Sequence, residues 1–288
     1  MSALPWSLWR SQILAVLRVE LKKTLLARRG LWIYLLAFAP CAIFTLYSIV
    51  QMKHGRSGDI GDDTHVFAGV FQLFFLRLAV FFGCVGIFMN LFRGEVLDKS
   101  LHYYFLAPVK RQVLVAGKFL SGLLASALIF ATSTVLSFFA LYWQFDSNVR
   151  QEYFYHGHGL EHLAIYLGVT LLACLGYGGV FLGAGVLFRN PLYPIVIMLV
   201  WEGINGFIPQ TLQHISVIFY LKSLCPVSVP ASVFMGEGGN SSPFALLAVN
   251  PTPASAITAV LGLLVLSGAL VAFTGRRVQH MEIDYGTE

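Results

Sequence analysis

The chain has 288 residues, of which 57% are hydrophobic and 11% are charged, and its formal net charge is +5. Soluble domains average roughly 45–50% apolar and about 25% charged residues, so a single water-soluble globule is excluded and lipid is the expected solvent. The four cysteines are scattered without a CxxC spacing, which argues against a metal or redox protein. The composition therefore predicts an all-α polytopic membrane protein.

A basic amphipathic helix is expected ahead of the first apolar run. Apolar residues recur at helical spacing over residues 5–29, and the same stretch carries Arg10, Arg18, Lys22, Lys23, Arg28 and Arg29. Such a helix lies in the membrane interface, with its apolar stripe in lipid and its cations at anionic headgroups. We therefore assign residues 1–30 to a cytoplasmic interfacial helix, with a plain basic arm as the alternative.

Residues 31–274 form one membrane domain with six apolar spans, and residues 275–288 form a cytoplasmic tail. A helix of about 20 residues crosses a ~30 Å hydrocarbon core. The spans are expected at about 31–50, 67–92, 117–143, 162–188, 192–209 and 254–274. In the fourth span Gly179 and Gly183 form a GxxxG step, which favours close helix packing within one subunit over a dimer seam.

The basic residues are distributed unevenly between the two sides of this arrangement. With the N-terminus inside, 14 Lys and Arg residues fall on the cytoplasmic side and 4 fall outside. The positive-inside rule then places both termini in the cytoplasm. We expect a multi-pass protein of the cell membrane, in a bacterium the plasma or inner membrane.

A polar, basic segment, residues 94–118, joins the second and third spans. Apolar residues recur there at three- and four-residue spacing, which predicts a short amphipathic helix over residues 96–105. Pro108 ends this helix because proline cannot continue the hydrogen-bond ladder. A short helix at the cytoplasmic surface between two spans is suited to receive force from a soluble partner.

The order of residues in this segment resembles the intracellular loop of ABC-2-type permeases, the six-span membrane subunits of ATP-driven exporters. The resemblance is carried by Gly94-Glu95, Ser100-Leu101, Leu106, Pro108, Arg111 and Lys118. Ser100 stands where the family has Thr. The resemblance implies an N-terminal elbow helix, a nucleotide-binding ATPase partner and a dimer with a second permease copy or a paralogue. It also implies coupling to the ATPase through Glu95, Leu97, Leu101, Tyr104, Pro108 and Arg111.

The chain has no Walker A loop of its own. Gly117-Lys118 is followed by Phe119 rather than by Ser or Thr, and Gln112 stands where the first glycine of that loop belongs. We therefore expect no catalytic residue, no metal and no cofactor in this chain, with ATP and Mg²⁺ bound by the partner subunit. The other expected partner is the lipid bilayer, and none is a nucleic acid.

Two charges fall inside the predicted spans. Arg77 lies about ten residues into the second span and Glu202 about eleven into the fifth, with Asn205 on the same helical face as Glu202. A charge at that depth costs at least about 2.5–3.5 kcal/mol, so it is usually paired or faces a cavity. We expect Arg77 and Glu202 to meet. The pair is either a packing contact between helices or a polar point on a transport path.

The sequence thus predicts the permease subunit of an ABC exporter and leaves its cargo open. The alternative is a membrane scaffold without transport activity, or a membrane-embedded enzyme that modifies lipid. No paired carboxylates, HExxH or GxSxG motif supports the enzyme.

Overall fold

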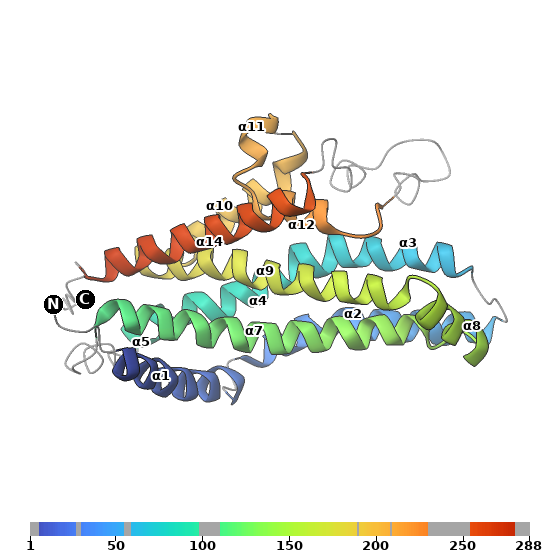
Figure 1. Ribbon diagram of the computed structural model, residues 1–288, viewed down its shortest axis with the longest axis horizontal. Coiled ribbons are helices and arrows are strands. Elements are labelled where there is room, and N and C mark those ends of the chain that lie inside the picture. The colour runs from blue at the N-terminus through green and yellow to red at the C-terminus, as the bar shows by residue number, and fades with distance from the viewer. Residues whose placement is uncertain are drawn as a thin grey trace.

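The computed structural model describes residues 6–26, 30–54, 59–97, 110–188, 190–207, 209–229 and 254–279, and all regular structure in these ranges is helical. Five helices are long and apolar enough to cross a membrane: α2 (Leu31–Lys53), the continuous helix Ile60–Gly94, α7 (Arg111–Tyr142), α9 (Gly159–Leu187) and α14 (Ala256–Gln279). They run along the long axis of the molecule (Figure 1). Five of the six predicted spans are therefore present as long apolar helices.

The second long helix contains two π-helical stretches. It comprises α3 (Ile60–Val70), η2 (Phe71–Val80), α4 (Phe81–Cys84), η3 (Val85–Met89) and α5 (Asn90–Leu97). π turns are rare and are frequent at functional sites. The longer stretch here, η2, carries Arg77.

This helix begins well before the predicted start at residue 67, in a stretch whose acids suggested a loop. Asp59 caps it by accepting a hydrogen bond from the N–H of Gly61. Asp63 is buried and accepts from the hydroxyl of Tyr47 at 2.8 Å and the amide of Gln144 at 2.5 Å. The acids fit a helix because a cap and partners from α2 and from the end of α7 satisfy them.

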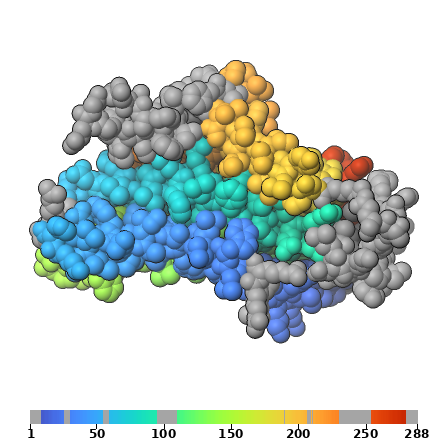
Figure 2. Space-filling view, turned by 180° about the vertical axis from the view of Figure 1, so that it is seen from behind, coloured from blue at the N-terminus to red at the C-terminus, as the bar shows by residue number. Residues whose placement is uncertain are grey.

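The remaining elements are short, apart from α1 (Trp6–Leu26). Between α7 and α9 lie α8 (Ser147–Gln151) and η4 (Glu152–His156), where a polar loop was expected. After α9 come α10 (Leu192–Gly203), η5 (Ile204–Phe207), α11 (Gln210–Gln213) and α12 (Val217–Leu224). Figure 2 shows the segment from α10 to α12, in yellow to orange, at the upper edge of the molecule beside the teal part of the second long helix.

The predicted fifth span, residues 192–209, is not one long helix. α10 has 12 residues and ends at Gly203. At 1.5 Å per residue it covers about 18 Å, short of a ~30 Å hydrocarbon core. The chain turns because the side chain of Glu202 is held by the first residues of α12, as the next subsection describes. Among the described residues the structure therefore has five long apolar helices and the short α10, and the predicted count of six spans is not confirmed.

Aromatic side chains and glycines fill the interior of the bundle. Phe67 stacks on Phe71, with ring centroids 5.9 Å apart, and both meet the edge of Tyr166. A Cβ added at Gly179 would lie 2.9 Å from Oγ of Ser267, and one at Gly183 would lie 3.1 Å from Oγ1 of Thr274, both on α14. The GxxxG step therefore packs α9 against α14 of the same chain, as expected.

One end of the bundle gathers three elements that are distant in the sequence. The start of α7 lies beside α1 and the end of α14 (Figure 1). A Cβ added at Gly117 would lie 3.1 Å from Cβ of Val16, so glycine permits the close approach of α1. The guanidinium of Arg111 donates to the carbonyls of Val278 at 3.2 Å and Gln279 at 2.9 Å.

Candidate functional site

The first candidate site is a buried ion pair where α1, α5 and α7 meet. Nζ of Lys118 lies 2.7 Å from Oε1 of Glu20, and the two side chains are 0% and 3% exposed. The same ammonium donates to the carbonyl of Leu91 at 2.9 Å and lies 5.3 Å from the ring centroid of Phe92. One lysine thus connects the interfacial helix, the end of the second long helix and the start of the third.

Sequence reasoning identified Lys118 only through the loop motif and did not single out Glu20. A usable signal was present, because Glu20 is the sole acid among the basic residues of the N-terminal arm. A lone carboxylate within an amphipathic basic helix points to a specific partner.

The residues predicted to contact an ATPase are only partly within the described ranges. Glu95 and Leu97 belong to the last turn of α5. Leu101, Tyr104 and Pro108 lie outside the described residues, as does most of the predicted helix over residues 96–105. Arg111 opens α7 and binds the end of α14, so its guanidinium has partners within the chain.

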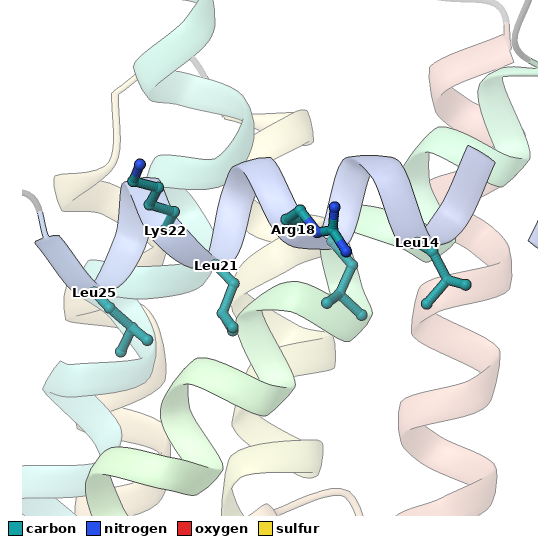
Figure 3. Close-up of a pocket in the computed structure, with 6 residues that line it drawn as sticks. Leu14, Arg18, Leu21, Lys22 and Leu25 are labelled. Carbon is teal, nitrogen blue, oxygen red and sulfur yellow. The ribbon is translucent and has the colours of Figure 1, made fainter. Parts of the chain in front are cut away.

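The surface of α1 carries a groove beside this junction. Its volume is about 610 Å³, and Leu14, Leu17, Leu21 and Leu25 line it together with Arg18 and Lys22. Figure 3 shows the labelled leucines on one side of the helix and Lys22 pointing away from them. Leu14 is 63% exposed. This pattern fits the expected interfacial helix, because an exposed apolar side chain such as Leu14 gains from contact with lipid.

The second candidate site lies at the end of α10, where Glu202 is buried. Its carboxylate accepts hydrogen bonds from the hydroxyl of Ser216 at 2.7 Å and from the backbone N–H groups of Val217 and Ile218, each at 3.0 Å. These groups form the first turn of α12. A carboxylate there satisfies N–H groups that have no partner within the helix and opposes the helix dipole.

Arg77 and Glu202 meet, but through a different atom from the one expected. Nη1 of Arg77 donates to the backbone carbonyl of Glu202 at 3.0 Å. This contact joins the guanidinium to the backbone of Glu202, whose carboxylate binds the start of α12. The similar depth of the two residues in their predicted spans indicated that they meet. It did not indicate that donors of α12 bind the carboxylate of Glu202.

A cavity of about 340 Å³ adjoins this contact, between η2, α9 and α10. Arg77, Tyr177 and Glu202 supply polar groups to its wall, and the remaining lining is mainly apolar. Tyr177 is 0% exposed, and its hydroxyl has no hydrogen-bond partner among the described residues. Asn205 is also buried, within η5, but it does not line the cavity.

Lys222 on α12 adds a second cation to this region. Burial, and next the positive charge of Arg77, lower the pKa of its ammonium to about 7. Glu202 and Cys225 act in the opposite direction. The charge of Arg77 thus acts on Lys222, which does not itself line the cavity.

Comparison with known families agrees with this architecture. A family model described as ABC-2 family transporter protein matches residues 16–205, which include Glu20, Arg77, Lys118 and Glu202. Comparisons with curated proteins and with solved structures returned no match. Because the match covers more than half of a chain made of long apolar helices, the protein belongs to the ABC-2 transporter family of membrane proteins.

Proposed function

We propose that the chain is the permease subunit of an ATP-driven exporter, with ATP and Mg²⁺ bound by a separate nucleotide-binding subunit. A second copy of the chain, or a paralogue, completes the membrane domain. Membership of the ABC-2 family supports the transport role. The ATPase partner, the outward direction and the dimer are the parts that experiment must establish.

The observation that carries the proposal is the junction around Lys118. Residues 94–118 run from α5 to α7, and Lys118 at the end of this segment binds both Glu20 of α1 and the carbonyl of Leu91 on α5. A force applied to this segment is transmitted to α5, α7 and α1 together, because rigid helices joined by a buried contact move as a unit. We assign Glu95, Leu97, Leu101, Tyr104 and Pro108 to the surface that receives this force.

The proposed topology places this junction in the cytoplasm. The start of α7 and the end of α14 lie at one end of the bundle together with α1. The basic residues of the chain are concentrated in the segments at that end, in agreement with the positive-inside rule. A bacterial inner membrane is the proposed location.

On this proposal, cargo moves past the region of Arg77, Glu202 and Asn205. Charged and amide side chains inside membrane proteins mark transport paths more often than lipid-facing surfaces. The cavity beside Arg77 supports this assignment, since it supplies both polar groups and apolar walls.

The test is to co-express the tagged chain with the product of a neighbouring reading frame that contains GxxxxGK[ST], and to purify the tagged chain. We expect the ATPase to co-purify in a stoichiometric complex and to hydrolyse ATP. Glu20→Gln should leave the complex assembled but reduce the effect of the permease on the ATPase rate. If no ATPase co-purifies and no neighbouring frame encodes one, the permease assignment is wrong.

A further inference from the structure

We infer that the cavity between η2, α9 and α10 binds an amphiphile whose head is a carboxylate or a phosphate ester and whose body is an apolar chain. Its role as cargo depends on the proposed function, whereas its binding does not. The inference is built on the hydrogen-bonding groups of the cavity, its basic side chain and its apolar wall.

The one acidic side chain among the described residues of the cavity wall, Glu202, already accepts hydrogen bonds from other groups of the protein. Ser216, Val217 and Ile218, from the first turn of α12, donate hydrogen bonds to the Glu202 carboxylate and satisfy both of its oxygens. A cationic ligand would have to compete with Ser216 and with two backbone N–H groups for this carboxylate. The cavity is therefore poorly suited to a cation.

Tyr177 offers a hydrogen bond that no described protein group accepts. Its side chain lines the cavity and is 0% exposed, and its hydroxyl has no partner among the described residues. Buried hydroxyl groups are normally paired, and an exception calls for a specific explanation. A ligand oxygen in the cavity provides one, because a phenol donates readily to a carboxylate or phosphate.

A basic side chain of the cavity also favours an anion. Arg77 lines it and supplies a guanidinium group. The guanidinium group of Arg77 is suited to this head, because guanidinium groups bind carboxylates and phosphates in a planar, two-bond geometry.

The rest of the wall suits an apolar chain. Leu73, Phe74 and Phe81 line the cavity, and Leu78 and Leu199 at its edge are each 38% exposed. The apolar wall therefore continues to the surface of the described part of the chain. The volume of about 340 Å³ is at the small end of the range of small-molecule sites, about 300–1,000 Å³. Such a site accommodates a compact head and the first part of a chain.

The experiment uses the full chain in nanodiscs of zwitterionic phosphatidylcholine, without ATP or a partner subunit. The probe is 11-(dansylamino)undecanoate, whose fluorescence rises on binding, and the competitors are dodecyl phosphate and dodecyltrimethylammonium. We expect dodecyl phosphate to displace the probe and the cation of equal chain length to leave it bound. Equal displacement by both competitors, or no saturable binding of the probe, would overturn the inference.

Matched variants then test the two groups that define the head site. Tyr177→Phe removes only the unpartnered hydroxyl, so it should fold normally and weaken binding by about tenfold or more, as expected for a bond to a charged acceptor. Tyr193→Phe, on the same short helix as Glu202 and 66% exposed, should bind like the wild type. Arg77→Gln should abolish binding and Arg77→Lys should retain part of it. Wild-type affinity in Tyr177→Phe would overturn the inference.

A last arm separates a free amphiphile from a membrane lipid with the same chemistry. If replacing part of the phosphatidylcholine by phosphatidylglycerol displaces the probe, the ligand is a bilayer phospholipid; if only dodecyl phosphate does so, it is a single-chain amphiphile. Either result supports the inferred head chemistry. Failure of binding leaves the ATPase test of the proposed function untouched. Conversely, binding without an ATPase partner would refute the proposed function alone.

Discussion

Lys118 and Glu20 are 98 residues apart in the sequence, yet Nζ of one lies 2.7 Å from Oε1 of the other in an interior that leaves both side chains almost without solvent contact. The ammonium also donates to the carbonyl of Leu91. Because burial removes the hydration of both charges, each depends on the other for its stability. The pair therefore holds α1 in place against the two long helices.

Removing one member of the pair is predicted to cost more than removing both. Glu20→Leu and Lys118→Met should each lower the free energy of unfolding by about 3–5 kcal/mol, because each leaves a buried charge without its counterion. The double variant should recover much of that loss. The measurement is unfolding of the purified protein in mixed detergent micelles, with Arg18→Leu, an exposed change on the same helix, as the control. Additive single effects would contradict the prediction.

Glu202 is predicted to be coupled to Ser216 more strongly than to the side chain of Arg77. Glu202→Gln leaves donors of α12 without an acceptor and should cost about 1–3 kcal/mol. A double-mutant cycle with Ser216→Ala should show clear non-additivity, since the two side chains share a hydrogen bond of 2.7 Å. The cycle with Arg77→Met should show less, because Arg77 contacts the backbone carbonyl of Glu202. The reverse order of coupling would mean that the guanidinium reaches the carboxylate.

Two glycines of α9 are predicted to respond oppositely to the same substitution. A Cβ at Gly185 would lie 3.0 Å from the carbonyl oxygen and 3.1 Å from Cα of Met89, and backbone atoms cannot move aside easily. Gly185→Ala should therefore destabilise the protein by about 1–3 kcal/mol. A Cβ at Gly168 meets no heavy atom within 4 Å, so Gly168→Ala should stabilise the helix by about 0.4–1 kcal/mol. Unfolding in the same micelles compares the two variants directly.

The pH dependence of stability is predicted to contain a contribution from Lys222. Burial and the positive charge of Arg77 lower the pKa of Lys222 from 10.5 to about 7, against the opposing effects of Cys225 and Glu202. Between these values the unfolded chain binds more protons than the folded chain, so stability rises with pH from about 7 to about 10.5 and is flat in this contribution below 7. In melting temperatures measured from pH 6 to 10, the wild type should rise relative to Lys222→Met above pH 7 and keep a constant difference from it below pH 7. Parallel curves throughout would show that the pKa is not lowered.

The proposed topology predicts where an impermeant maleimide reacts in intact cells. With the four native cysteines replaced by alanine, Asn148→Cys in α8 should be labelled from outside. Arg277→Cys, in the last turn of α14, should be labelled only after permeabilisation. Both positions are exposed, so failure of labelling reports the side of the membrane rather than burial. The opposite pattern would invert the assignment of the cytoplasmic side.

The sequence alone determined the solvent, the helical class and the approximate positions of five long spans. Each of these depends on sums over neighbouring residues: a window of about 20 apolar residues is enough for a span, and counting Lys and Arg is enough for a predicted orientation. The motif order around Pro108 and Lys118 further indicated the family that the match over residues 16–205 shows. Such properties can be predicted without knowing which side chains are in contact.

The tertiary structure decided every pairing on which the candidate sites depend. Glu20 was overlooked because its partner lies 98 residues away, and no local pattern specifies a contact at that separation. The fifth predicted span was too long because hydropathy ignores competition for a carboxylate: the first turn of α12 binds Glu202 and turns the chain back. The same competition directs Arg77 to a backbone carbonyl and leaves Tyr177 in a cavity wall with a buried hydroxyl that no described group accepts. Hydrogen bonds depend on distance and direction between atoms, and only the packed helices determine both.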